Sequence, residues 1–523
     1  MSRRRVGVCL FCLLCLLCGE VAVAVRADAQ GSAIIRGEVI QVDGTTRAPG
    51  VVVVAVDTAG TEVTRSLSGA SGNYALTVPA PARYVIRALR IGFRPTVIQA
   101  VEVSQGEVRK LDISLAGEAV RLAAVLVESR ASCRIRSDSG QLVARLWEQA
   151  TAALAASTLA SGGRALTTTL GQYRQYTAKG ERAIQSESLT VVRDAAGSGF
   201  VSVPAETLAV HGYIVTDKSR VTYHSPDANA LLSPSFASVH CFTVRPAPPA
   251  HAEWIGIGFA PSAQRRVPEI TGTLWLDRKS AELRRLEFEY VNLPRSTGYG
   301  DADGWVQFKH LATGDWIISR WAIRHPDTEE RTGGPGSARY VVVGARVTGG
   351  LTLSVAQDGA VLYSDGGASL RVALRAGDSV NSAPGARGAI VGTSHFAIAD
   401  STQAMTFAGL VAGRFQVEVT TPFMKWIGAA PQQVEVEVSF DSVRTISVPI
   451  PVLAELGMRK CLSIGALVYG TVSYADGRPA PLAELNLSWD EQMPLLGRTR
   501  TRRTERRSIT KRADGLGHWA ACV

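Results

Sequence analysis

The chain repeats one pattern of valines, acids and arginines at two places far apart. Residues 101–113 read VEVSQGEVRKLDI and residues 436–448 read VEVSFDSVRTISV, so the same residue types recur at the same spacing. Upstream of each segment lies a second match in the same order, at residues 83–85 and 414–417. Two copies of one β module are the simplest explanation, and chance similarity between valine-rich strands is the alternative.

Short apolar segments separated by turn residues fill the first copy. They follow one another at intervals of roughly 8 to 12 residues, which is typical of a β-sandwich. Within them the chain has Gly37-Glu38-Val39, Ala48 to Val54, Gly72 to Pro79 and Ile91-Gly92-Phe93. Each of these four elements begins or ends at a turn, so the strands between them are short.

This order of elements resembles the carboxypeptidase regulatory-like domain, over residues 33–116. The resemblance implies a seven-stranded, transthyretin-like sandwich of the kind found on exported enzymes, surface proteins and outer-membrane receptors. Where that family commonly has T-D-x-x-G, residues 68–72 read SGASG without an acid. A cation at that turn is therefore not expected.

A third, shorter copy begins near the C-terminal end. Its elements are Val468 to Val472, the turn 476–481 (DGRPAP), the strand Glu484 to Trp489 and the turn Asp514-Gly515. The first copy has three further strands after the corresponding point. The third module is therefore incomplete within this sequence, or another segment supplies its missing strands.

The region between the first two copies has a different pattern. Residues 141–157 place Leu142, Leu146, Ala150 and Leu154 at helical spacing, which predicts one amphipathic helix. Strand-like segments joined by polar turns dominate residues 166–325, and we interpret them as an antiparallel sheet.

The predicted fold is mainly β, with tandem transthyretin-like or Ig-like β-sandwich modules on both sides of a helix-plus-antiparallel-sheet middle domain. The expected parts are a signal peptide (1–29), the regulatory-like sandwich (33–116), a linker with the helix (117–165), the middle domain (166–345), a second sandwich (346–452) and the third module (461–523).

The N-terminal residues have the form of an export signal. Arg3, Arg4 and Arg5 precede an apolar stretch at residues 6–17, and Ala27-Asp28-Ala29 offers a small-residue cleavage site. No later apolar run is long enough to span a membrane as a helix. We expect an exported protein of the periplasm or cell envelope, or a secreted one, without a transmembrane segment in the mature chain.

The charge distribution argues against a nucleic-acid partner. The net charge is +10, but residues 498–512 alone hold eight basic residues against Glu505, and much of the remaining excess lies in the signal. A charged, solvated edge strand that resists aggregation explains this run, with polyanion or membrane-surface binding as the alternative.

Motifs that would indicate an enzyme are missing from the sequence. There is no G-x-S-x-G, no phosphate loop, no H-E-x-x-H and no H-x-x-E. Six of the eight histidines fall between His211 and His325 without ligand spacing, so we interpret them as structural or surface residues. No catalytic residue, metal site or cofactor is predicted.

Aromatic residues give the best signal for binding. Tyr474, Trp489 and Trp519 of the third module are candidates to stack on sugar rings, and packing in a sandwich core is the competing interpretation. The leading hypothesis is a non-enzymatic exported envelope protein whose sandwich modules act as a scaffold or as protein-interaction surfaces. The alternative is a carbohydrate-binding envelope protein, so the expected partner is an envelope protein or a glycan.

Four cysteines remain after the expected signal, which predicts two disulfides in an exported chain. Of the three possible connectivities, we predict Cys133 to Cys241 and Cys461 to Cys522, because each pair brackets one proposed domain. Free, buried thiols are the alternative.

Overall fold

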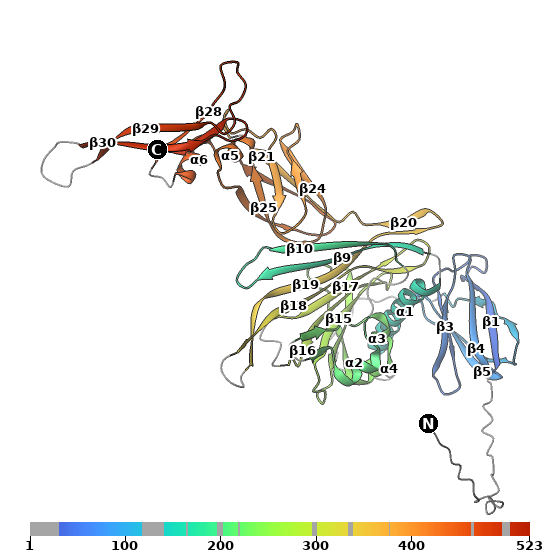
Figure 1. The fold of residues 1–523 in the computed structure, drawn as a ribbon. Helices are drawn as coiled ribbons and strands as arrows, with labels where there is room; N and C mark the ends of the chain where they lie inside the picture. The colour runs from blue at the N-terminus through green and yellow to red at the C-terminus, as the bar shows by residue number, and fades with distance from the viewer. Residues whose placement is uncertain are drawn as a thin grey trace, which may run out of the picture.

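The computed structural model describes residues 31–117, 141–163, 166–195, 202–217, 220–294, 301–332, 338–375, 377–461, 465–493 and 503–523. The expected signal peptide and Cys133 lie outside these residues. Figure 1 shows four parts along the chain, namely a first sandwich, a large curved sheet with helices, a second sandwich and a small C-terminal part. The prediction of a mainly β chain with sandwiches flanking a helix-plus-sheet region is confirmed.

The first sandwich consists of two sheets around a closed apolar core. Its strands are β1 Gly31–Ile40, β2 Val52–Val56, β3 Glu62–Leu67, β4 Asn73–Ala80, β5 Ala82–Leu89, β6 Thr96–Val103, β7 Val108–Lys110 and β8 Ile113–Ser114. One sheet has the order β4-β1-β7, with β8 also on β1, and the other has the order β3-β2-β5-β6. β1 is antiparallel to β4 and parallel to β7.

Alternation of side chains explains how β4 joins this core. Its eight residues are exposed and buried in turn along the whole strand, as expected when one face of a sheet is solvated. Gly72 precedes the strand with φ of 76°, and a β-carbon there would lie 2.7 Å from the carbonyl oxygen of Val39. This turn therefore requires glycine both for its conformation and for its close backbone approach.

The middle of the chain forms one large antiparallel sheet. Its strands are β9 Leu166–Ala178, β10 Ser186–Ala195, β13 His240–Arg245, β14 Trp254–Pro261, β15 Glu269–Asp277, β16 Leu283–Val291, β17 Asp303–His310, β18 Trp316–Thr332, β19 Ala338–Gln357 and β20 Ala360–Ser364. The order is β10-β9-β19-β18-β17-β16-β15-β14-β13, with β20 on β19. A separate hairpin joins β11 Ile214–Asp217 to β12 Arg220–Tyr223.

Helices cover one face of this sheet. They are α1 Gln141–Gly163, α2 Ala205–His211, α3 Ala228–Leu232 and α4 Pro234–Val239, and Figure 1 shows them on the same side. Leu146 and Leu154 of α1 join Phe242, Phe259 and Trp316 of the sheet in one buried core. The predicted helix is confirmed, and it continues beyond residue 157 to Gly163.

The first sandwich packs directly against the helical side of this region. Val52 and Val54, on the outer face of β2, belong to the same core as α1. The Gln149 side chain accepts a hydrogen bond from Gly92 N at 2.6 Å, and the turn glycines Gly50 and Gly314 meet backbone to backbone. These contacts attach the first sandwich to the middle domain.

The second sandwich repeats the strand order of the first. Its strands are β21 Ala368–Arg375, β22 Arg387–Ile390, β23 Phe396–Ile398, β24 Ala404–Leu410, β25 Gly413–Thr420, β26 Gln432–Val438 and β27 Val443–Pro449. The two sheets are β24-β21-β27 and β23-β22-β25-β26, and β21 is parallel to β27 as β1 is to β7. The two segments with matching sequences occupy β6–β8 in the first sandwich and β26–β27 in the second.

The start of the second module differs from the prediction. The sequence predicts it from residue 346, but β19 continues to Gln357 and pairs with β9 and β18, and β20 also joins the middle sheet. Residues 346–364 therefore pair with the middle sheet, and the second sandwich begins at Ala368. The reason is that β19 is a single strand of 20 residues, far longer than its hydrophobic pattern alone indicates.

The C-terminal part contains two short sheets. Its elements are α6 Leu453–Lys460, β28 Leu467–Thr471, β29 Glu484–Met493, β30 Arg503–Arg512 and β31 His518–Cys522, and α5 Pro422–Ile427 of the second sandwich lies beside it. β28 pairs with β31 and β29 pairs with β30. Cys461 and Cys522 form the predicted disulfide, with an S–S distance of 2.02 Å. Cys241 is also disulfide-bonded, and its predicted partner Cys133 lies outside the described residues.

Candidate functional site

The C-terminal part reproduces the first four strands of the first sandwich. Gly470 pairs with Trp519 between β28 and β31, where Gly37 pairs with Tyr74 between β1 and β4. β29 and β30 form an antiparallel pair, as β2 and β3 do. We call this part the third module.

The hydrogen bonds at the start of the two modules also correspond. In the first module Val39 N donates to Gly72 O at 2.8 Å and Ala48 N donates to Val39 O at 2.9 Å. In the third, Val472 N donates to Gly517 O at 2.8 Å and Ala480 N donates to Val472 O at 2.8 Å. The shared backbone pattern identifies which strand of the third module corresponds to which strand of the first.

One position shows how closely the two backbones agree. Leu482 has φ of 60°, and it occupies the place of Gly50, whose φ is 71°. A left-handed backbone is unfavourable for leucine. The third module therefore has the same turn geometry as the first, although leucine stands where the first has glycine.

Counterparts of β5, β6 and β7 do not occur among the described residues of the third module. In the first sandwich β5 pairs with the second edge of β2, and β7 pairs with the second edge of β1. Within the described chain, β29 pairs only with β30 and β28 pairs only with β31. Two strand edges are therefore left without a neighbouring strand.

The inner face of the third module is open for the same reason. Val53 and Ala55 of β2 are 0% exposed in the first core, whereas their counterparts Leu485 and Leu487 are partly exposed. Val468, the counterpart of the fully buried Ile35, is 36% exposed. The third module thus presents a half-covered apolar face beside its open edges, which we call the acceptor face.

The three predicted binding residues occupy different places in this module. Trp489 lies on β29 on the acceptor face, and Trp519 lies across Gly470, whose added β-carbon would be 3.1 Å from the indole. Tyr474 is 55% exposed and stands in a turn with the Arg478 guanidinium 5.8 Å from its ring centre. Among the described residues no ring contact joins these three, so the structure does not bring them together as one sugar-stacking surface.

Aromatic residues that the sequence did not single out hold the third module in place. Tyr469 packs edge-on against Phe423 and Trp426 of α5, with ring centres 5.1 and 5.6 Å apart. His518 lies 4.5 Å from the Trp426 ring. Leu456 of α6 completes this small core. The outer face of β28 and β31 is therefore anchored to the second sandwich, and the acceptor face points away from that contact.

The first sandwich, with its eight strands β1 to β8, resembles a known domain. Residues 34–116 match the carboxypeptidase regulatory-like domain. This confirms the resemblance predicted from the turns and strands of that segment, and we call the first sandwich the regulatory-like module. No curated protein matches the chain.

Several solved structures show partial likeness to the chain. GBS52, the minor pilin of Streptococcus agalactiae, is 18% identical, with 19% of this chain and 49% of that chain covered and a TM-score of 0.14. BcpA, the major pilin subunit of Bacillus cereus, is 8% identical, with 80% and 99% covered and a TM-score of 0.15. The Bacillus anthracis TIE protein is 13% identical, with 59% and 56% covered and a TM-score of 0.16. The chain spans about half the length of GBS52 and of the TIE protein. TM-scores this far below 0.5 do not indicate a shared overall fold.

A second candidate site lies on the face of the middle sheet opposite the helices. A hollow of about 470 Å³ crosses β13, β15, β16 and β17 there. Its polar and aromatic lining comprises Arg245, Thr271, Thr273, Arg285, Glu287, Glu289, Asp303 and Trp305. We call this hollow the basin. Sequence reasoning missed it, although the outward positions of β16 and β17 alternate with buried ones.

The turn between β26 and β27 of the second sandwich forms one border of the basin. Phe440 meets Trp305 edge-on with ring centres 6.4 Å apart. The neighbouring Asp441 accepts two hydrogen bonds from Arg320 of β18, at 2.5 and 2.6 Å. Arg320 also donates to Asp365 at 2.6 Å, and both of these side chains are almost fully buried. This Arg320 clamp fixes the second sandwich against the sheet.

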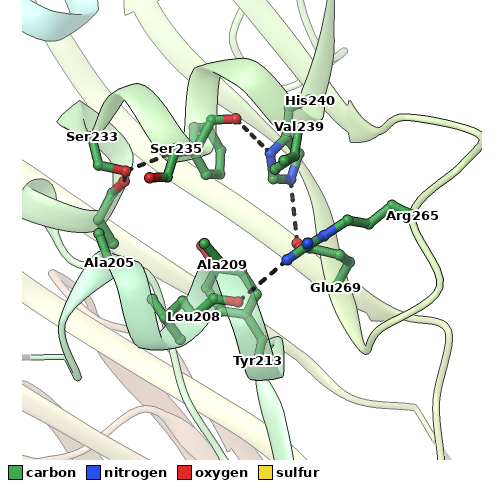
Figure 2. Close-up of a pocket in the computed structure, with 12 residues that line it drawn as sticks. Ala205, Leu208, Ala209, Tyr213, Ser233, Ser235, Val239, His240, Arg265 and Glu269 are labelled. Atoms are coloured by element: carbon green, nitrogen blue, oxygen red, sulfur yellow. Dashed lines mark hydrogen bonds and ion pairs between the residues drawn. The ribbon is translucent and has the colours of Figure 1, made fainter.

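A small pocket lies under α2 and α4, and Figure 2 shows its lining. His240 Nδ1 donates to the Phe236 carbonyl at 2.9 Å, and Nε2 lies 3.4 Å from Glu269 Oε2, close enough for an ion pair but not aligned for a hydrogen bond. Arg265 Nε donates to Glu269 Oε1 at 2.7 Å. Burial first, then the Glu269 charge, raise the pKa of Tyr213 in the same space well above its ordinary value.

This buried cluster does not have the form of a catalytic site. The space holds about 10 Å³, which suits a single water molecule and excludes a substrate. Nδ1 of His240 is committed to a backbone carbonyl, and Nε2 faces a carboxylate rather than a hydroxyl. A histidine base needs one ring nitrogen directed at the proton that it removes. The cluster joins β13 and β15 to the helices above them.

Three other histidines of the middle domain pack on aromatic rings. His251 stacks on Trp254, His310 on Trp316 and His325 on Tyr223, with ring centres 3.7, 4.9 and 4.7 Å apart. Within the described ranges, no three His, Cys, Asp or Glu residues are grouped as metal ligands would be. No helix in the described part of the chain is long and apolar enough to cross a membrane.

Proposed function

We propose that the chain is a non-enzymatic exported envelope protein, and that its third module binds an extended segment of a partner protein by strand addition. The observation that carries this proposal is the acceptor face, where two open strand edges border a half-covered apolar surface. Exposed strand edges readily accept a further strand, and natural proteins usually protect them. Here the edge of β29 lies beside partly exposed Leu487 and Trp489.

The regulatory-like module indicates what kind of strand would fit. There β5 runs antiparallel to β2 and directs Tyr84, Ile86 and Ala88 into the core, each 3% exposed or less. The partner segment for β29 should likewise be extended, with apolar side chains at alternate positions. Main-chain hydrogen bonds then supply affinity, and the alternate side chains supply specificity.

Two further features support an exported scaffold. The Cys461–Cys522 disulfide ties the end of β31 to the end of α6, and such bonds persist in oxidising compartments. The regulatory-like module and the second sandwich are each held to the middle domain by buried contacts. The third module is thereby carried on a rigid support.

The test uses a labelled peptide of residues 81–104, which contains β5 and β6 of this chain, as the strand donor. We expect it to bind the full chain, with a loss of at least tenfold in affinity in Leu487→Lys, because a charge would enter the acceptor face. The matched control is Asn486→Lys, one residue along β29 on the exposed side, which should bind as the natural chain does.

Fluorescence anisotropy measures the affinity, and circular dichroism checks that both variants keep their β content. Equal binding of a scrambled peptide, equal loss in the two variants, or no binding at all would each reject strand addition. Turnover of a peptide, glycan or ester substrate by the purified chain would reject the non-enzymatic assignment.

A further inference from the structure

The strand register shows how the open face of the middle sheet is laid out. One row across the strands runs Gly258, Thr273, Glu287, Trp305 and Ala322, since each of these residues pairs with the next. Three residues of this row, Thr273, Glu287 and Trp305, line the basin. They form its floor.

Larger polar side chains stand on both sides of this floor. A neighbouring row brings Trp275, Arg285, Gln307 and Arg320 together by the same pairing. The row on the other side brings together Thr271, Glu289, Asp303 and Arg324. From these two rows, Arg285 lines the basin on one side and Thr271, Glu289 and Asp303 line it on the other. The basin is thus a trough across β15, β16 and β17 with hydrogen-bonding groups on both sides.

Most charges in the trough already have a partner. Arg285 lies 2.8 Å from Glu287, which also accepts a hydrogen bond from Trp275 Nε1 at 2.9 Å. Asp303 pairs with Arg324. Within the described residues, no ion pair or side-chain hydrogen bond reaches Arg245 or Glu289. The lining is close to electrically balanced, with one free cation and one free carboxylate.

An aromatic ring lies in the middle of this polar lining. Trp305 is partly exposed, and the Arg285 guanidinium is 4.6 Å from its ring centre. Phe440 holds the indole from the side of the second sandwich. These two contacts hold the ring in place before any ligand arrives, which lowers the entropy lost on binding.

We infer that the basin is a binding site for a neutral oligosaccharide. A sugar offers an apolar face that matches an indole and hydroxyl groups that match carboxylates, threonines and arginines. The basin volume of about 470 Å³ lies within the usual range for ligand sites, which is roughly 300 to 1,000 Å³. This site lies on the middle domain and is independent of the strand addition proposed for the third module.

Other ligand classes fit the basin less well. A polyanion would meet the free carboxylate of Glu289 and the acids of the Asp303 wall. An extended peptide gains affinity from an open strand edge, but β15, β16 and β17 below the basin are each paired on both sides. An uncharged, hydroxyl-rich ligand is not repelled by these acids and does not need an open strand edge.

The experiment measures binding of cellotetraose, xylotetraose, mannotetraose and chitotetraose to the full chain by isothermal titration calorimetry. We expect at least one to bind, with a loss of about tenfold in Trp305→Ala, since stacking on one indole contributes about that factor. Because Trp305 also touches Phe440, Glu289→Gln and Arg245→Ala serve as independent variants at the other end of the basin. Each should weaken the same ligand, and Trp489→Ala in the third module should not.

Three results would overturn the inference. They are absence of binding by all four sugars at millimolar concentration, unchanged affinity in all three basin variants, and tighter binding of tetragalacturonate than of any neutral sugar. Binding of the 81–104 peptide that is lost in Glu289→Gln would assign the basin to peptides instead. A loss in Trp489→Ala alone would place the sugar on the third module.

Discussion

Replacing Arg320 tests whether the clamp holds the second sandwich against the middle sheet. Arg320→Leu removes the hydrogen bonds to Asp365 and Asp441 and the contact with the Phe440 ring, whose centre lies 4.4 Å away. Burial alone would lower the pKa of Arg320, but the bonds and charges of Asp441 and Asp365 raise it above its ordinary value. Arg320 therefore stays charged, and its positive charge compensates the negative charges of Asp365 and Asp441.

The two halves of the clamp should differ in strength. The Asp365 side chain is 3% exposed, so losing Arg320 leaves a buried carboxylate without its cationic partner, although the Gly367 amide still donates to it. Breaking a buried pair in this way costs about 3 to 5 kcal/mol. The Asp441 side chain is 72% exposed, and an exposed pair contributes about 0.2 to 1 kcal/mol. Arg320→Leu should thus weaken the junction by about 3 kcal/mol or more, and Asp441→Asn by less than about 1 kcal/mol.

Hydrogen exchange at the junction measures this difference, because a multi-domain chain does not unfold as one unit. Amides of residues 360–367 and 439–443 should exchange about 100-fold faster in Arg320→Leu, and less than about tenfold faster in Asp441→Asn. The double variant Arg320→Met with Asp365→Leu should regain most of the protection, since no buried charge remains. Equal acceleration in the two single variants, or none in Arg320→Leu, would show that the clamp does not hold the junction.

Four further predictions concern other parts of the chain. Replacing Cys461 and Cys522 by serine should destabilise the third module by about 4 kcal/mol in the chain-entropy model, because the bridge closes a loop with a sequence separation of 61 residues. Local hydrogen exchange should show this loss in the third module and little change elsewhere. Peptide mapping without reductant should in addition yield a Cys133–Cys241 peptide, and alkylation of all four thiols would refute that pairing. Gly50→Ala should loosen the regulatory-like module, because its β-carbon would lie 2.5 Å from Gly314 O. Gly44→Ala is the control, since it carries the same backbone strain at φ of 72° but has open space around the β-carbon. Hydrogen exchange at β2 should be faster only in Gly50→Ala, and equal effects of the two variants would show that the contact with Gly314 does not matter. Burial holds the pKa of His325 below its ordinary value of 6.5, so the unfolded chain binds protons more readily and stability should fall as the pH drops through that value. His325→Gln should reduce this loss of stability, measured by thermal unfolding from pH 7.5 to 5. Part of the loss should remain, because burial also lowers the pKa of His224 and of His395.

Local pattern predicted the sandwiches well, because a sandwich strand is specified by alternation and by its turn residues. The regulatory-like module follows from such signals, for example the alternating strand Asn73–Ala80 after Gly72. The disulfide Cys461–Cys522 followed from domain boundaries drawn in the same way. A helix over residues 141–157 was predicted from its spacing of apolar residues, and the observed helix continues to Gly163.

Features that depend on pairing between distant strands could not be predicted from local pattern. The basin exists because Trp305 stands opposite Glu287 on one side and Ala322 on the other, and that register is invisible in any one strand. Helices α2, α3 and α4 are five to seven residues long, too short for a helical period to emerge. Trp489 was proposed as a sugar-stacking residue from its type alone, and the structure places it on the inner face of a half-open sandwich.

The disulfide at the third module also determines how a pulling force would travel through the chain. A load applied at Val523 enters Cys522 and crosses the sulfur bridge to Cys461, one residue after α6. The polypeptide between these cysteines, including β28 to β31, lies outside that path and carries no tension. The acceptor face would therefore keep its shape while the rest of the molecule is stretched.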